Sequence, residues 1–283
     1  SIELRKDRLN RCIKMVKEYS DEIIEALQKD FGNRDPKSSF LTEIATTIGV
    51  LEHAIKNVEK WAKDEKRPSN VDRPFFIRML MGLLGSKSYI KYQPLGTVGV
   101  ISPWNFPVNL ILAPLAGIFA AGNRTMIKPS ELTPATSEVT KKMFEAYFDK
   151  SEAAVFTGDA EVGAAFSALP FDHLLFTGGT QIGKKVMKAA SDNLVPVTLE
   201  LGGKSPVIVD ENANLSDVAK KVMRGKTMNA GQICLAPDYL MLPKGKSQEF
   251  TKASNDAVSE MFADLKYNDD YTSVINERHY ERI

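Results

Sequence analysis

Residues 98–128 read VGVISPWNFPVNLILAPLAGIFAAGNRTMIK, and they contain the clearest alternation of strand and helix patterns in the chain. Residues 98–101 form a short apolar run that is typical of a strand buried in a parallel sheet. Residues 110–121 have the length and apolar content of a core helix, and residues 125–128 form a second short strand. Since parallel neighbours are joined by a crossover, usually a helix, the stretch predicts a βαβ unit.

The same alternation continues toward the C-terminus. Thr133 is expected to cap a helix whose first residue is Pro134, and another helix is expected over residues 182–190. Further strands are predicted at residues 173–176, 195–199 and 206–209. The alternation predicts an α/β fold in which a parallel sheet carries helices on both faces.

Upstream, apolar residues at intervals of three or four predict two amphipathic helices, over residues 9–27 and 44–61. We expect the second helix to end at Arg67-Pro68. An apolar patch at residues 75–84 is followed by residues 88–92, which alternate as in a strand exposed on one face. Such a strand can pair outside its own domain.

The composition excludes several classes of function. The chain has 283 residues, 43% of them hydrophobic and 26% charged, which is enough for one large domain or two ordinary ones. With 37 Lys and Arg against 36 Asp and Glu, we expect no nucleic-acid partner. The two cysteines, Cys12 and Cys234, support neither a disulfide framework nor a metal site, and they predict a reducing, cytoplasmic setting.

A membrane span is the alternative interpretation of residues 96–123, which contain no charged side chain. Pro103, Pro107 and Pro114 interrupt this stretch, and the first two would break a spanning helix. We therefore expect a buried strand, a loop and a core helix here, and no membrane partner.

Two short motifs have the composition of ligand sites. The turn around Gly178 and Gly179 follows a strand and opens a helix, so its amides could face a phosphate, although a plain tight turn also explains the glycines. Lys128 and Glu131 place a cation and a carboxylate just beyond a strand, where open α/β sheets bind ligands. A ribose could use both, and a solvated salt bridge is the alternative.

Cys234 and Glu200 are the candidate reactive side chains. Residues 229–234, NAGQIC, form a small, polar lead-in that would leave the Cys234 thiol accessible, whereas Cys12 lies in an apolar helical pattern. No histidine lies near Cys234 in the sequence, so a papain-like pair is not indicated. Glu200 ends an apolar strand and suits general-base work, with a structural salt bridge as the alternative.

Together with residues 103–107, PWNFP, and 200–206, ELGGKSP, these motifs resemble the aldehyde dehydrogenase superfamily in order and spacing over nearly the whole chain. Residues 157–163, 193–200 and 236–239 look most like the coniferyl aldehyde dehydrogenase branch. The resemblance implies oxidation of an aldehyde to a carboxylic acid through a cysteine thioester. In that chemistry Cys234 is the nucleophile, Asn105 binds the oxyanion, and Glu200 activates the hydrolytic water.

The resemblance also implies a dinucleotide site. Its residues would be Ser102, Pro103, Trp104, Lys128, Ser130, Glu131, Gly178, Gly179, Thr180, Gly183, Leu201 and Gly202. A carboxylate at the adenosine ribose repels the additional phosphate of NADP, so NAD is expected, with NADP as the alternative. Gly179 stands where many members have serine, which leaves that contact to backbone amides.

The implied architecture is a Rossmann-type NAD(P)-binding domain over residues 1–203 and the first part of an α/β catalytic domain over residues 204–283. An oligomerisation strand is expected near residues 86–94, in a homodimer. Since family members continue beyond Ile283, we expect a fragment of a longer protein. The alternatives are a cysteine-dependent acyl hydrolase or thioesterase, and a cofactor-binding fragment without turnover.

Overall fold

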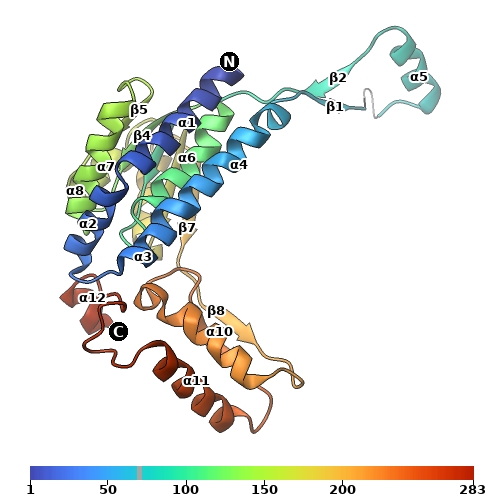
Figure 1. Cartoon of the computed structure of the whole chain (residues 1–283). Helices are drawn as coiled ribbons and strands as arrows, with labels where there is room; N and C mark the ends of the chain where they lie inside the picture. Colours follow the sequence, from blue (N-terminus) through green and yellow to red (C-terminus); the bar gives the residue numbers. More distant parts are fainter. Residues whose placement is uncertain (69–71) are drawn as a thin grey trace.

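A computed structural model of the chain describes residues 1–68 and 72–283. Its elements form a main α/β part, an arm that extends away from it, and a smaller C-terminal part (Figure 1). Within the described ranges, no helix combines the length and the apolar character needed to cross a membrane. The apolar stretch after residue 108 is instead the 13-residue helix α6 (Asn109–Ala121), whose apolar side chains are largely buried.

The central sheet of the main part is parallel throughout, with the strand order β5-β4-β3-β6-β7. Its strands are β3 (Thr97–Ile101), β4 (Arg124–Lys128), β5 (Ala153–Val155), β6 (His173–Gly178) and β7 (Val197–Leu201). The chain winds from β3 outward to β5 and then crosses back to β6. The winding therefore reverses between β3 and β6, and ligands of open α/β sheets bind at such a point, beyond the carboxyl ends of the strands.

Helices cover both faces of this sheet, as predicted. Val98 and Val100 of β3 belong to one apolar cluster, whereas Leu174 and Phe176 of β6 belong to another. The first cluster includes side chains of α1 (Ile2–Glu18), α2 (Ser20–Phe31), α4 (Thr46–Trp61), α6 and α7 (Pro134–Tyr147). The second includes side chains of α8 (Ala160–Ser167) and α9 (Thr180–Ser191). The α/β fold with a parallel sheet is therefore confirmed.

The helix predicted over residues 9–27 is wrong as one element, because the chain forms α1 and α2 with a break at Tyr19. Asp21 and Glu22 lie in the first turn of α2, where carboxylates favour a new helix N-terminus. The predicted end of α4 at Arg67-Pro68 is also wrong. The helix ends at Trp61, because the following residues leave the main part and enter the arm.

Thr133 precedes α7 as predicted, but its side chain makes no capping hydrogen bond. Asp30, at the end of α2, performs this role instead. Its carboxylate accepts hydrogen bonds from the amides of Ala135 and Thr136 at 2.9 and 2.8 Å. The cap is thus supplied by a residue distant in sequence, which satisfies the helix N-terminus and ties α2 to α7. Strand β5 and helix α8 were not predicted.

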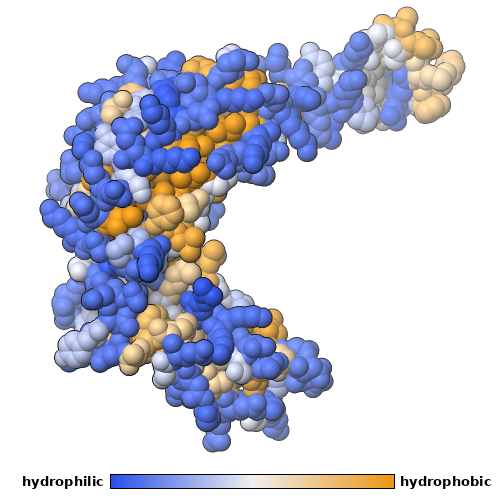
Figure 2. All heavy atoms as spheres, in the orientation of Figure 1, coloured by the Kyte–Doolittle hydropathy of each residue, from blue (hydrophilic) through white to orange (hydrophobic). Residues whose placement is uncertain are grey.

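The arm is an antiparallel pair of β1 (Glu65–Arg67) and β2 (Ser88–Ile90), with α5 (Phe75–Leu83) at its far end (Figure 1). All three residues of β2 are exposed, so the expected alternation of buried and exposed positions is wrong within this chain. No residue of α5 is buried, and Phe75 and Leu83 are 78% and 79% exposed. The apolar surface at the tip of the arm is plain in Figure 2.

The C-terminal part has its own small core. Its elements are β8 (Ser205–Ile208), α10 (Leu215–Thr227), η2 (Met228–Gly231), β9 (Pro237–Met241), α11 (Ser247–Met261) and α12 (Glu277–Arg282). Strands β8 and β9 pair in parallel, separately from the central sheet. The last segment returns to the main part, where Ile275 joins the first apolar cluster and the His279 ring lies 4.9 Å from the Trp104 ring.

Candidate active site

The cofactor-site residues predicted from the sequence follow the carboxyl ends of four parallel strands. The strand register places Ile101 opposite Lys128 and Phe176, and Gly178 opposite Leu201. The segments that come after these positions therefore begin at one edge of the sheet. The winding of the chain reverses between β3 and β6, and ligands of open α/β sheets bind beyond the carboxyl ends of the strands at such a point. The fold therefore brings the predicted segments to the place where a ligand is expected.

Lys128 and Glu131 form an ion pair at the end of β4. The Lys128 Nζ atom lies 2.8 Å from Glu131 Oε2, and the lysine side chain is 3% exposed while the glutamate is 45% exposed. Partial burial raises the pKa of Glu131, but the hydrogen bond and charge of Lys128 outweigh it, so the pKa is lowered overall. The pair therefore presents one ionised carboxylate to solvent at the sheet edge.

Ser130 belongs to the structure of the same loop. Its Oγ atom accepts a hydrogen bond from the amide of Leu132 at 3.2 Å, and its carbonyl oxygen accepts one from the Ser137 hydroxyl at 2.9 Å. The residue is 8% exposed. In this structure Ser130 shapes the loop that carries Glu131.

The glycine turn after β6 opens α9 and leaves space beside it. A Cβ atom on Gly178 would lie 2.6 Å from the Phe176 ring, and one on Gly183 would lie 2.9 Å from Leu201 Cδ2, so both glycines allow close packing. At Gly179, no atom of the described residues other than Gly179 itself and its two chain neighbours lies within 4 Å of that position. The first amides that bind the Gly179 carbonyl oxygen are those of Ile182 and Gly183. The amides of Thr180 and Gln181 lie in the first turn of α9, where amides have no intrahelical acceptor and attract an anion.

The segment after β3 continues the sheet before it turns. The Ser102 amide donates to the carbonyl oxygen of Lys128 at 3.1 Å. Trp104 packs between the Phe31 ring, at 6.4 Å, and the His279 ring, at 4.9 Å. Pro103 lies between these two residues in the sequence, and both its neighbours are held by contacts to other elements.

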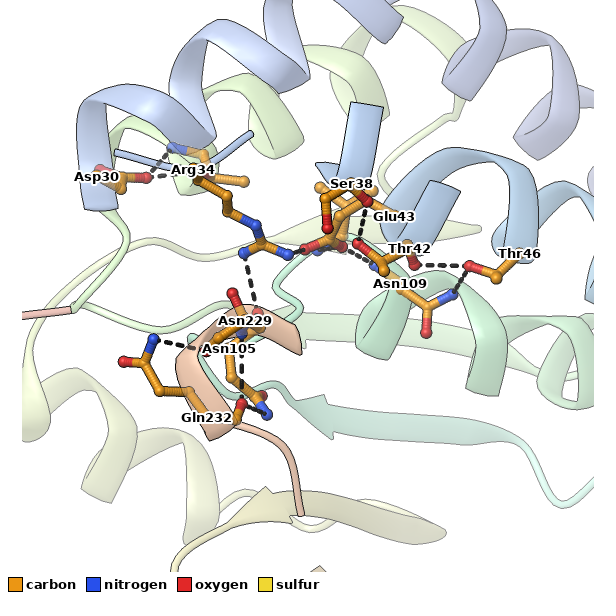
Figure 3. Close-up of polar contacts among 12 residues, drawn as sticks. Asp30, Arg34, Ser38, Thr42, Glu43, Thr46, Asn105, Asn109, Asn229 and Gln232 are labelled. Atoms are coloured by element: carbon orange, nitrogen blue, oxygen red, sulfur yellow. Dashed lines mark hydrogen bonds and ion pairs between the residues drawn. The ribbon is translucent and has the colours of Figure 1, made fainter. Parts of the chain in front are cut away.

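Asn105 is joined to the loop that carries Cys234. Its Nδ2 atom donates to the carbonyl oxygen of Gln232 at 2.9 Å, and its own carbonyl oxygen accepts a hydrogen bond from Asn229 Nδ2 at 3.2 Å (Figure 3). Asn229 and Ala230 have φ angles of 50° and 53°, in the left-handed region that residues with a Cβ atom rarely adopt. Backbone strain of this kind gathers at functional sites, and here it lies in the loop that leads to Cys234.

The thiol of Cys234 is exposed, in contrast to that of Cys12, which is buried. Glu200 is exposed near the end of β7, and throughout residues 1–68 and 72–283 it forms no ion pair, which leaves the salt-bridge alternative without support. A Cβ atom on Gly203 would lie 3.8 Å from the carbonyl oxygen of Cys234. The segment that follows Glu200 therefore runs beside the cysteine loop.

All 283 residues match the sequence model of the aldehyde dehydrogenase family. The chain belongs to the aldehyde dehydrogenase family. A relative in Caulobacter vibrioides, named "Probable coniferyl aldehyde dehydrogenase", is 53% identical over 100% of this chain and 57% of its own length. The resemblance to this family and branch is therefore confirmed.

Solved structures of the family agree with the fold. The structure of AldH from Staphylococcus aureus, in a substrate-bound state, has a TM-score of 0.90 at 40% identity and covers 100% of this chain and 59% of its own. The aldehyde dehydrogenase of Mycobacterium tuberculosis, solved with NAD+, has a TM-score of 0.77 at 26% identity, with 90% and 50% covered. The chain thus spans a little over half the length of the curated relative and about half or more of the solved chains.

Two residues at the site of this aldehyde dehydrogenase family member were missed by the sequence analysis. Arg34 and Glu43 form an ion pair at 2.9 Å, and their side chains are 2% and 0% exposed. Arg34 Nη1 also donates to the carbonyl oxygen of Asn105 at 3.0 Å (Figure 3). Burial raises the pKa of Glu43, against the opposing effect of the Arg34 charge. No sequence signal distinguished these two from ordinary surface charges.

Proposed function

We propose that this chain forms the cofactor-binding part and the cysteine-bearing part of an enzyme that oxidises an aldehyde to a carboxylic acid with NAD. The hydrogen bond from Asn105 to the carbonyl oxygen of Gln232 carries this proposal. It holds a side-chain amide next to the loop of an exposed thiol, two residues before Cys234. An amide donor and a thiol held together in this way are the parts that thioester chemistry requires.

In the proposed reaction, the Cys234 thiolate attacks the carbonyl carbon of the aldehyde and forms a thiohemiacetal. The Asn105 amide nitrogen carries two protons and, among the residues that the structure describes, donates one hydrogen bond, to Gln232, so its second proton can bind the developing oxyanion. The backbone amide of Cys234 is the second donor. Loss of hydride from the former aldehyde carbon then leaves a thioester on Cys234.

Glu200 acts in the second half of the proposed cycle. As a base, its carboxylate takes a proton from a water molecule, which attacks the thioester carbonyl and releases the acid and the Cys234 thiol. Its exposure to solvent and its lack of an ion pair within the described ranges support this role. The position of Gly203, three residues after Glu200, also supports this role, because it brings the segment that follows Glu200 close to the carbonyl oxygen of Cys234.

The residues at the sheet edge fit a dinucleotide, and NAD, when bound, would supply the acceptor of the hydride. Lys128 and Glu131 would bind the hydroxyls of the adenosine ribose, and the amides beyond Gly179 would bind the pyrophosphate. The empty space beside Gly179 and the first-turn amides of α9 support this fit. The ionised Glu131 carboxylate would repel the 2′-phosphate of NADP, which favours NAD.

We propose further cofactor-binding residues at or after the ends of β3, β4, β6 and β7. They are Ser102, Pro103, Trp104, Ser130, Gly178, Thr180, Gly183, Leu201 and Gly202. We place the division between the cofactor-binding and catalytic domains after residue 203, since β7 ends the central sheet and β8 begins a separate one. The name of the Caulobacter relative leads us to propose coniferyl aldehyde, or another aromatic or unsaturated aldehyde, as substrate.

We also propose that the protein is a cytoplasmic homodimer in which the arm contacts a second copy. Strand β2 pairs only with β1 among the described strands, so the hairpin has free edges. The unburied apolar side chains of α5 lie at the end of the same arm. A free strand edge and an unburied apolar helix are features of association surfaces.

The test of the enzymatic proposal is Cys234→Ser in the intact protein, with Cys12→Ser as the matched control. We expect Cys234→Ser to abolish NADH formation from coniferyl aldehyde, measured by absorbance, while calorimetry shows unchanged NAD binding. Cys12 is buried in the first apolar cluster, so Cys12→Ser should lower stability and keep turnover. NADH formation that persists without the Cys234 thiol would overturn the role, and ester cleavage without aldehyde-dependent NADH would favour an acyl hydrolase.

A further inference from the structure

We propose that the buried pair of Arg34 and Glu43 positions Asn105 for oxyanion binding. The pair holds the main chain of residues 105–109 at its two ends, so that the Asn105 amide is already in place when the charge develops. The inference rests on the proposed function, in which Asn105 is an oxyanion donor. Arg34 and Glu43 act through Asn105 and touch no substrate, so they are positioning residues.

Arg34 fixes the carbonyl end of the segment. Its Nη1 atom donates to the carbonyl oxygen of Asn105 at 3.0 Å, while Nη2 is bound to Glu43 (Figure 3). The guanidinium lies over the rings of Phe31 and Phe106, at 4.7 and 5.2 Å from their centroids. These two aromatic contacts and two hydrogen bonds restrict the conformation of the Arg34 side chain. The hydrogen bond from Nη1 then fixes the position of the Asn105 carbonyl group.

Glu43 fixes the other end of the segment. One carboxylate oxygen, Oε1, binds Arg34, and the other, Oε2, accepts hydrogen bonds from the amides of Val108 and Asn109 at 3.1 and 2.8 Å. These amides open helix α6, where a carboxylate also interacts favourably with the helix dipole. The ion pair therefore spans residues 105–109 and holds them at both ends.

The helix that carries Glu43 has an unusual geometry. Glu43 lies in η1 (Phe40–Ala45), a π-helix inserted between α3 (Pro36–Ser39) and α4. Its carbonyl oxygen accepts a hydrogen bond from Thr47 Oγ1 at 2.6 Å. A π-helix is less favourable than a continuous α-helix and is found mostly where function requires a particular side-chain direction. Here the wider turn accompanies a carboxylate directed at the Asn105 segment.

Stability alone does not explain the pair. Removing two charges from water costs free energy that their attraction often fails to recover, and apolar replacements of similar size are often at least as stable. An apolar pair, however, would not fix the positions of the Asn105 carbonyl and the first amides of α6, which Arg34 and Glu43 hold by directional hydrogen bonds. Defined geometry of the segment is therefore what this pair contributes, and oxyanion donors depend on geometry.

The test is a double-mutant cycle between Arg34→Lys and Asn105→Ala in the intact protein. Lysine keeps the charge but cannot reach both Glu43 and the Asn105 carbonyl with a planar fork. We expect Arg34→Lys to slow the first burst of NADH by about 10- to 100-fold, while NAD binding by calorimetry stays within about twofold, because misplaced catalytic groups affect the chemical step. In the Asn105→Ala background, Arg34→Lys should change the burst by less than about twofold, since its effect passes through Asn105.

Equal slowing of the burst in both backgrounds would overturn the inference, because a general structural role would not depend on Asn105. Arg11→Lys is the matched control: it alters another arginine–glutamate pair, distant in the fold, and should lower the melting temperature without changing the burst. If Arg34→Lys does not fold, Glu43→Gln is the second variant, with the same expected dependence on Asn105. A wild-type protein that forms no NADH would instead refute the proposed function.

Discussion

Glu152 ties helix α1 to the start of β5, and its charge should make stability depend on pH. Its carboxylate lies 2.9 Å from the nearest nitrogen of both Arg8 and Arg11, and its side chain is 19% exposed. The hydrogen bonds from Arg11 lower the pKa of Glu152, partial burial raises it, and the hydrogen bond from Arg8 lowers it again, so that the pKa falls from 4.5 to about 2. Glu152→Gln keeps the shape of the side chain and removes this charge.

The sign of the effect follows from the two pKa values. Above its ordinary pKa of 4.5 the carboxylate is ionised in both states, so the ion pairs stabilise the fold in full. As the pH falls from 4.5 toward 2, the unfolded chain takes up the proton first, and the stabilisation is lost. The difference corresponds to about 3 kcal/mol at most, and solvent screening reduces it to about 2 kcal/mol.

The assay is urea unfolding followed by circular dichroism at a series of pH values from about 7 down to about 3.5. We expect Glu152→Gln to lower the free energy of unfolding by about 2 kcal/mol at neutral pH and by clearly less at the acidic end. Glu145→Gln, which removes one exposed carboxylate from α7, is the control and should change stability little at any pH. A deficit in Glu152→Gln that stays constant, or grows, as the pH falls would refute the ionic explanation.

Two further predictions concern the proposed reaction in the intact protein. Glu131→Gln should raise the ratio of kcat/KM for NADP over NAD by about tenfold, because it removes a carboxylate whose pKa is lowered and which would repel a 2′-phosphate; an unchanged ratio would contradict the ribose assignment. Glu200→Gln should slow steady turnover far more than the first burst of NADH in rapid mixing with coniferyl aldehyde, because its base acts on the thioester. A burst that disappears together with turnover, and does not return at high pH, would rule out this role.

Local patterns were enough to predict much of the main part. The apolar run of residues 98–101, the helix after it and the short strand at residues 125–128 appear in the structure within two residues. The predictions failed where a distant residue decided the outcome. Asp30, not Thr133, caps α7, and α4 ends early because the chain leaves for the arm. Propensity within a short window contains no information on such partners.

The alternation of strands and helices, the family and the candidate residues Asn105, Glu200 and Cys234 could all be predicted from the amino-acid sequence. Each of these follows from residue types at neighbouring positions or from motif order. The three-dimensional fold was needed to establish the strand order that reverses between β3 and β6 and the placement of the predicted cofactor segments at one edge. Only it revealed the buried pair of Arg34 and Glu43 around Asn105, because contacts between residues so far apart in the chain arise from packing and are not encoded in any local period.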